Sequence, residues 1–252
     1  MEGRDWVDAL ELAPQRELLL SLLDAVEADT RFRALEVGCS LGRGNADELS
    51  DVDVGLWIDD EWWDAAVNDL EPLLRQLAST VDAVGFDAPW GRWFFAQYAD
   101  GRQLDIAAQR ASTARRRPPD SIVLFDRDGI LEARSAKKPA DRRAEWAFLA
   151  WFELGNIPKY IARGSMWEAL GALEQARAEF LRLYAANIGS AIPEFGMTSI
   201  FDIPGGGVPP RLTETYPRPD VGEIRGAARV LAGLLTDAWE RPPLAEWVEP
   251  QL

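Results

Sequence analysis

Apolar residues in the first eighty positions follow two different periods. Over residues 6–28 they recur every three to four positions, which predicts a helix, and Pro14 is expected near its start because proline suits a first helical turn. Residues 33–38 and 52–58 favour strands, and a helix is predicted over 59–79. The acidic residues that open this second helix suit the positive end of the helix dipole, which explains them without a further role.

Four more strands are predicted before the chain changes character. They cover residues 81–87, 92–99, 102–108 and 121–125. The second and third are expected to form a hairpin, because Ala99-Asp100-Gly101-Arg102 between them carries Asp-Gly at its centre.

Beyond about residue 136 the apolar pattern becomes helical, with helices predicted over 140–163, 166–188 and 221–239. Gly164 is expected to cap the first of them, and Pro158 to kink or shift it. Residues 192–220 are rich in Pro and Gly and predict an extended loop.

The chain is therefore expected to have two parts, a mixed α/β half over 1–136 and an all-helical half over 137–252. They are predicted to meet near Ala136-Lys137-Lys138-Pro139.

Tryptophan is abundant, with 11 residues in the chain. Trp146, Trp151 and Trp167 lie at helical spacing and are interpreted as packing residues. Trp90 and Trp93 are predicted to lie in the core, with the lining of a substrate cleft as the alternative.

Composition narrows the classes of function. The chain has 252 residues, is 47% hydrophobic and carries a formal net charge of −15, which argues against a nucleic acid bound through its phosphates and suits a cationic substrate. One cysteine excludes an internal disulfide. Neither a signal peptide nor a membrane-spanning run is evident, so a cytoplasmic location is expected.

The chain contains no histidine. This excludes Ser-His-Asp and Cys-His catalysis, zinc held by histidine, and histidine general bases. Acid–base and metal chemistry must therefore be carried by carboxylates.

A glycine-rich turn followed by two spaced carboxylates is the most informative motif. Gly38-Cys39-Ser40-Leu41-Gly42-Arg43-Gly44 precedes Ser50-Asp51-Val52-Asp53-Val54. Side chains two apart on a strand point the same way, so Asp51 and Asp53 would repel each other unless a cation lay between them. Backbone N–H groups in a glycine turn suit a polyphosphate. The motif thus predicts a site for a metal-bound nucleotide.

Gly38-Cys39-Ser40, a spacer of ten residues and Asp51-Val52-Asp53 resemble the signature of the DNA polymerase β-like nucleotidyltransferase superfamily. Residues 40–51 look especially like its small-molecule branch, which includes aminoglycoside and lincosamide nucleotidyltransferases. The resemblance implies an α+β fold, in which a nucleotidyltransferase-type mixed sheet with helices precedes a helical domain. Cys39 departs from the pattern, because glycine usually stands there; a positive φ at this position would strain it or change the turn.

The superfamily also requires a third carboxylate on a later strand, and Asp105 in Leu104-Asp105-Ile106 fits it. The resemblance implies that Asp51, Asp53 and Asp105 hold two Mg²⁺ ions, and that Asp105 serves as the base for the acceptor hydroxyl. Glu36 and Asp47 are not assigned to the site and are predicted to be solvated or capping.

Phosphate contacts are implied for the turn, with Ser40 and the amides of Gly38 and Cys39 around the β- and γ-phosphates. Lys159, in the helical half, is the candidate clamp for the triphosphate, and a solvated lysine is the alternative. Arg43 is a candidate for phosphate contact, with a surface arginine as the equal alternative.

The implied reaction moves a nucleoside monophosphate, AMP from ATP in the first instance, to a hydroxyl of a small molecule such as an aminoglycoside-like polycation. Two alternatives stay open: an antitoxin-type enzyme that adenylylates a protein, and a non-catalytic nucleotide-binding protein. The identity of the acceptor, the base preference and the oligomeric state are not readable from the sequence.

Two other motifs are interpreted as structural. Phe125-Asp126-Arg127-Asp128-Gly129-Ile130 resembles the nucleophile loop of haloacid-dehalogenase-like phosphatases, but the later acidic strand of that family is missing, so a strand ending in a turn is predicted. Gly205-Gly206-Gly207 lacks the Lys-Ser/Thr of a phosphate-binding P-loop and predicts a loop.

Overall fold

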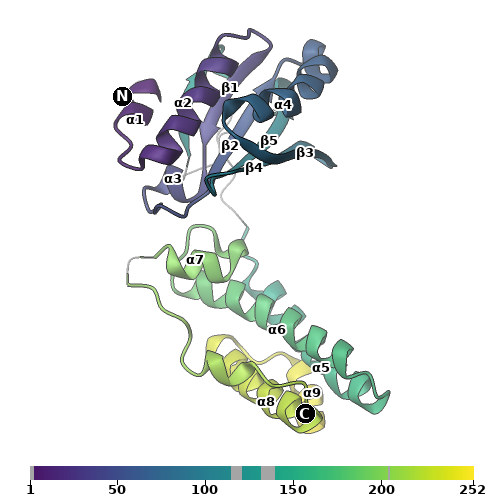
Figure 1. The fold of residues 1–252 in the computed structure, drawn as a ribbon. Coiled ribbons are helices and arrows are strands. Elements are labelled where there is room, and N and C mark those ends of the chain that lie inside the picture. The colour runs from purple at the N-terminus through teal and green to yellow at the C-terminus, as the bar shows by residue number, and fades with distance from the viewer. Residues whose placement is uncertain (1–2, 115–120, 132–139, 204) are drawn as a thin grey trace. The chain divides into compact units, whose positions relative to one another are not determined.

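The computed structural model describes residues 3–114, 121–131, 140–203 and 205–252 (Figure 1). Its internal contacts divide the chain into two units, Met1–Lys138 and Pro139–Leu252. The expected boundary at 136–139 lies outside the described residues. In the described part of the chain, no helix is both long and apolar enough to cross a membrane.

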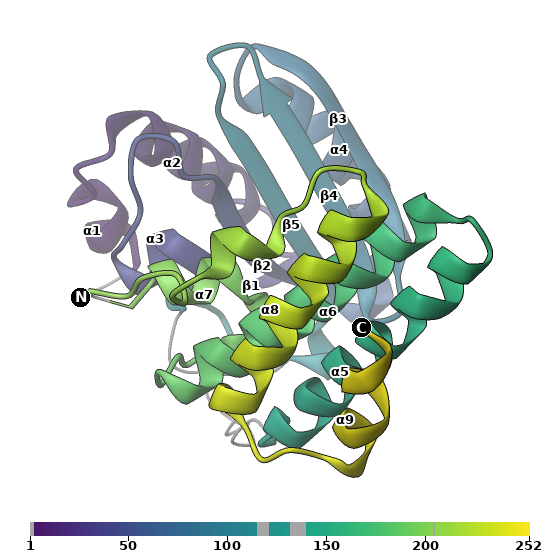
Figure 2. The ribbon, with the colours of Figure 1, turned by 90° about the horizontal axis from the view of Figure 1, so that it is seen from below.

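The first unit is built on a six-stranded mixed sheet with the order β3-β4-β5-β2-β1-β6. The strands are β1 (Phe32–Val37), β2 (Val52–Ile58), β3 (Thr80–Ala88), β4 (Gly91–Tyr98), β5 (Gln103–Arg110) and β6 (Ile122–Asp126). β2 and β5 are parallel, and the other neighbouring pairs are antiparallel. Figure 2 shows β3, β4 and β5 side by side. Every strand predicted from the sequence is present, within two residues at each end.

Helices cover one face of this sheet. α1 (Gly3–Asp8), α2 (Ala13–Glu27) and α4 (Trp63–Leu77) contribute to a single core with the strands, and α2 and α4 are visible beside the sheet in Figure 1. Leu22 of α2 and Leu70 of α4 are fully buried there with Val54 and Ile106 of the central strands. Since side chains alternate along a strand, Asp53 and Asp105 must point to the opposite face.

Among the described residues of the first unit, apolar packing on that opposite face is found at one end of the sheet. A small second cluster consists of Ala34, Trp57, Ala114 and Leu131. The chain also makes short helical turns at α3 (Cys39–Arg43), η1 (Asp60–Trp62) and η2 (Ala111–Thr113). The predicted helix over 59–79 is therefore a 3₁₀ turn that leads into α4.

Turn chemistry fixes the hairpin between β4 and β5 as predicted. The Gly101 N–H donates to the carbonyl of Tyr98 over 3.0 Å, and Gly101 has a φ of 93°, which favours glycine. The Asp100 carboxylate accepts from the Arg102 N–H over 3.1 Å. The Asp-Gly pair thus supplies both the backbone freedom and the side-chain acceptor that the turn needs.

The second unit is helical, with α5 (Arg143–Ala162), α6 (Met166–Asn187) and α8 (Val221–Ala238) as its long helices. Gly164 ends α5 as predicted: its φ is 73°, its N–H donates to Ile161, and the Ser165 N–H donates to Tyr160, which is the Schellman pattern. α5 is one helix that includes Pro158. The mixed sheet with helices and the helical second unit confirm the α+β prediction and are consistent with the nucleotidyltransferase fold.

Two predictions for this unit are wrong in detail. The expected extended loop at 192–220 contains the short helices η3 (Pro193–Phe195), α7 (Met197–Phe201) and η4 (Leu212–Thr215). The chain end forms α9 (Pro243–Val248) and η5 (Glu249–Gln251), which the pattern did not indicate. Trp146 and Trp151 are buried as expected, whereas Trp167 is 72% exposed and so does not belong to the core of this unit.

Candidate active site

Strand register places two of the three predicted carboxylates side by side. Asp53 on β2 is the direct partner of Asp105 on β5 in the parallel pairing. Partners in such a pair project to the same face, and neighbouring strands lie about 4.8 Å apart. Both residues are half-buried. The two strands therefore bring together acids that are 52 positions apart in the sequence.

Asp51 completes the group from the exposed segment just before β2. Burial first, and then the charges of Asp53 and Asp51, together raise the pKa of Asp105 to about 6. Loss of hydration also raises the pKa of Asp51. The three carboxylates are thus close enough for the charges of Asp51 and Asp53 to act on Asp105.

The glycine turn is attached directly to this pair of strands. The Gly38 N–H donates to the carbonyl oxygen of Asp53 over 2.9 Å, so the turn begins beside the central carboxylate. α3 follows at once, with Gly38 in an extended conformation before it and Gly44, at a φ of 74°, after it. Ser40 and Arg43 both lie on this helical turn and are half-buried.

Cys39 occupies the left-handed region, with a φ of 49°. This conformation normally favours glycine, because a Cβ then crowds the following carbonyl oxygen. Cys39, the residue at which the sequence departs from the superfamily pattern, therefore has a backbone conformation that glycine would adopt without strain. The turn is retained here at the expense of local backbone strain.

The donor set suits a hard divalent cation, because carboxylate oxygens are the ligands that Mg²⁺ prefers. Within the described residues, however, no three acidic, cysteine or histidine side chains converge closely enough to hold a metal ion as they stand. The backbone register places Asp53 beside Asp105.

Lys159 lies on α5 in the second unit, where its Nζ donates to Asn156 Oδ1 over 3.0 Å. Its role as a triphosphate clamp stays a prediction, as do the phosphate contacts of Arg43, Ser40 and the turn amides.

Glu36 differs from the sequence prediction. It is 1% exposed on β1, and the Ser121 hydroxyl donates to its Oε2 over 2.7 Å, so it is neither solvated nor a cap. Its register partner on β2 is Gly55, two residues beyond Asp53 on the same face. The alternation of strand 33–38 placed Glu36 on the polar face, but it could not show that Ser121, 85 positions later in the chain, meets Glu36 there. Asp47 is a cap as predicted, accepting from the Leu49 N–H over 2.9 Å.

The phosphatase-like segment has the structural role that was predicted. The Asp126 carboxylate accepts from the N–H groups of Ile130 and Leu131, at 2.9 and 2.8 Å. Gly129 has a φ of 65°, as a turn requires. A carboxylate held by two backbone donors at a strand end closes the turn rather than acting as a nucleophile.

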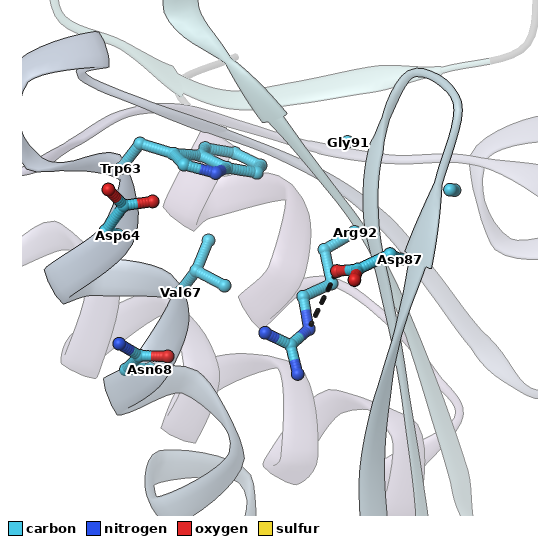
Figure 3. A pocket seen from close by; sticks show the side chains of 8 residues that line it. Trp63, Asp64, Val67, Asn68, Asp87, Gly91 and Arg92 are labelled. Atoms are coloured by element: carbon cyan, nitrogen blue, oxygen red, sulfur yellow. Dashed lines mark ion pairs between the residues drawn. The ribbon is translucent and has the colours of Figure 1, made fainter.

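Two hollows flank the β3–β4 hairpin on opposite faces of the sheet. One, of about 420 Å³, lies between α4 and the hairpin, where Trp63 and Asn68 face Arg92 and Asp87, whose Nε and Oδ1 are 3.8 Å apart (Figure 3). Arg92 shares the face of the buried Phe94, so this hollow is on the helical side. The other, of about 350 Å³, includes Asp105 and lies on the face of the candidate site.

Comparison with known proteins gives limited information. No protein-family model matches the chain, and no curated protein sequence matches it. Among solved structures, the crystal structure of an aminoglycoside 6-adenyltransferase from Bacillus subtilis is similar, with 14% sequence identity and a TM-score of 0.35. The match covers 94% of this chain and 95% of that one. A similarity this distant does not transfer an activity.

Proposed function

We propose that this chain is a metal-dependent nucleotidyltransferase that moves a nucleoside monophosphate, AMP from ATP in the first instance, to a hydroxyl group of a small molecule. The observation that supports it best is the Asp53–Asp105 register pair, together with the hydrogen bond from Gly38 to Asp53. It links an acidic pair and a phosphate-suited turn within one rigid part of the sheet.

The chemistry would be an in-line displacement. The acceptor oxygen would form a bond to the α-phosphorus while the bond from that phosphorus to the bridging oxygen of the β-phosphate breaks, so that pyrophosphate leaves. Mg²⁺, held by Asp51, Asp53 and Asp105, would neutralise charge on the phosphate oxygens. Asp105 would also take the proton of the acceptor hydroxyl, because no histidine is available for this role.

The turn would bind the rest of the triphosphate. Ser40 and the amide of Cys39 would face the β- and γ-phosphates, whereas the Gly38 amide is already bonded to the Asp53 carbonyl and holds the turn in place. Arg43 would add a positive charge at the end of α3. Lys159 is proposed as a second cationic contact, supplied by the helical unit. The acceptor would be hydroxylated and cationic, which fits the net charge of −15.

Pyrophosphate release tests this proposal. It should be measured with each of the four nucleoside triphosphates against a panel of aminoglycosides, lincosamides and other hydroxylated small molecules. With the best pair, Asp53→Asn is expected to lower the rate at least about a hundredfold, since charge stabilisation in the transition state is lost. Asp64→Asn, an exposed acid on the helical side, is the matched control and should leave the rate unchanged. Wild-type release by Asp53→Asn would refute the proposal.

A further inference from the structure

An exposed group of aromatic side chains lies on the open face of the β3–β4 hairpin. It consists of Phe86, Trp90, Trp93 and Phe95 and is called the aromatic platform below. The rings of Trp93 and Phe95 are stacked, with centroids 5.3 Å apart and planes at 22°. Trp90 meets Trp93 edge-on at 5.6 Å, and Phe86 lies 6.2 Å from Phe95.

These rings are exposed, contrary to the prediction that Trp90 and Trp93 belong to the core. Both are 40% exposed, and Phe86 is 57% exposed. The reason is the alternation of β4: Phe94 and Ala96 enter the core beneath the helices, so Trp93 and Phe95 must face the other way. Adjacent exposed aromatic rings of this kind mark a binding surface more often than isolated apolar residues do.

The aromatic platform is continuous with the candidate active site. One row crosses four strands in register: Val84 pairs with Phe95, Phe95 with Asp105, and Asp105 with Asp53. Phe95 and Asp105 also line the same hollow of about 350 Å³. Phe95 is one strand spacing from the acid, about 5 Å, and Trp93 lies about 7 Å further along β4.

The polar side chains that also line this hollow, beside Val84 and Ala96, are held in place. Gln103 Nε2 donates to Gln97 Oε1 over 2.7 Å, and Gln97 Nε2 donates to the carbonyls of Tyr98 and Arg102. Asp82 is paired with Arg75 over 3.0 Å, so Asp105 supplies the negative charge that a ligand meets. Among the described residues that line the hollow, none is Lys or Arg.

We infer that the aromatic platform is the acceptor subsite, and that it takes an amphipathic amine with a flat ring rather than a strongly hydrophilic polycation. This inference rests on the proposed function. An ammonium group gains about 0.5–2 kcal/mol against the face of a tryptophan, and an apolar ring buries area against Phe95 and Trp93. The reacting hydroxyl of the ligand would lie at Asp105 and its ammonium group at the aromatic platform. The strand spacing sets the distance between these two groups at about 5–9 Å.

Three small probes separate the features of this ligand. 4-(Aminomethyl)benzyl alcohol has a ring, an amine and a hydroxyl at the required spacing; 4-methylbenzyl alcohol lacks the amine, and 6-amino-1-hexanol lacks the ring. Ligand-observed NMR without nucleotide gives their dissociation constants. The first probe should bind at least about tenfold more tightly than either of the others. Equal binding of all three would overturn the inference.

Variants locate the binding. Trp93→Leu should weaken the first probe at least about fivefold. Trp62→Leu changes another exposed tryptophan, in the turn η1 that follows β2, and should leave binding of the probe unchanged. Unchanged binding in Trp93→Leu overturns the inference. Three other outcomes for this variant would also overturn the inference. Weaker ATP binding with the probe unaffected would assign the rings to the nucleobase, and loss of a dimer in sedimentation would assign them to a second copy of the chain. A fall in melting temperature above about 5 °C would assign them to internal packing.

A failure of the inference about the aromatic platform can be distinguished from a failure of the proposed function. Probe binding is measured without nucleotide and does not depend on transfer. If Asp53→Asn released pyrophosphate like the wild type, the proposed function would fail while the probe result stood. If transfer occurred but Trp93→Leu left the KM of the acceptor unchanged, the aromatic platform alone would be excluded.

Discussion

Asp53 and Asp105 are direct partners in the parallel pairing of β2 and β5, and each projects to the face that the helices leave open. Two half-buried carboxylates one strand spacing apart conflict electrostatically in a metal-free protein. The structure tolerates this conflict at the centre of its sheet, where simple stability would favour apolar residues. Trade-offs of this kind are found at functional sites.

Removal of one carboxylate should stabilise the metal-free protein at neutral pH. The pKa of Asp105 is about 6 in the folded chain against 3.8 in the reference state, so the folded state binds this proton more tightly. The stability contributed by protonation is complete below pH 4 and is lost as the pH rises through 6. Asp105→Asn is therefore expected to gain about 1–2 kcal/mol at pH 8, after discounting for its partial exposure, and nothing near pH 4.

Urea unfolding in EDTA at both pH values measures this effect. Asp82→Asn is the control of opposite sign, because the hydrogen bond from Arg75 lowers the pKa of Asp82. The Asp82→Asn variant should be less stable than the wild type at pH values above the usual pKa of an aspartate. If Asp105→Asn were less stable than the wild type at pH 8, the conclusion that the charged Asp105 carboxylate destabilises the folded protein would be contradicted.

Divalent metal with nucleotide should stabilise the folded wild-type protein through its carboxylates. A ligand that binds only the folded state at a hundred times its dissociation constant adds about 2.7 kcal/mol. Mg²⁺ with ATP is expected to raise the melting temperature of the wild type, and Asp53→Asn should abolish the increase. Differential scanning fluorimetry with Mg²⁺, with Ca²⁺ and with EDTA checks this. An equal increase in the Asp53→Asn variant would mean that the ion binds elsewhere.

Gly55 is required by the packing next to the acids. A Cβ at this position would lie 2.7 Å from the Trp57 ring and 3.1 Å from Glu36 Cγ. Gly55→Ala should therefore lower the free energy of unfolding by about 1–3 kcal/mol, as overpacking usually does. Gly226→Ala is the matched control: it lies in α8 with open space around it and should gain up to about 1 kcal/mol. Thermal unfolding of both variants tests the contrast.

Backbone strain at Cys39 gives another test. Because its φ is 49°, Cys39→Gly should be at least as stable as the wild type, with a gain of up to about 1 kcal/mol. Cys39→Val should be clearly less stable, since a β-branched residue is disfavoured there. Cys39→Ala separates the loss of the thiol from the backbone effect. If the glycine and alanine variants were both less stable than the wild type, the thiol contacts would outweigh the strain, and a glycine variant less stable than the alanine variant would contradict the strain itself.

Local signals accounted for most of the fold. The apolar run at 52–58 and the turn chemistry of Gly101 and Gly164 depend on neighbouring residues, and the structure agrees with all of them. The candidate acids were found by their alternation in strands and by resemblance, and the register of β2 with β5 confirms that Asp53 and Asp105 are neighbours.

Long-range burial was not predictable in the same way. Alternation assigns a residue to one of two faces, but it does not say what covers that face. Glu36 is buried because β6 and Ser121 come from a segment 85 positions away, whereas Trp93 is exposed because no described residue covers that part of the open face. The aromatic platform could be recognised only after the sheet order was known.

The sheet order places the two acids on interior strands and Phe86 on an edge strand, so substitutions near them have different consequences. The acids Asp53 and Asp105 lie on interior strands, and each of these strands is held by a neighbour on both sides. Phe86 lies on β3 at the sheet edge, where one side of the strand has no partner within the described sheet. Substitutions in β3 can therefore accumulate without altering the spacing of the two acids. Under the proposed function, this architecture would let ligand preference diverge among descendants while the reaction chemistry is inherited unchanged.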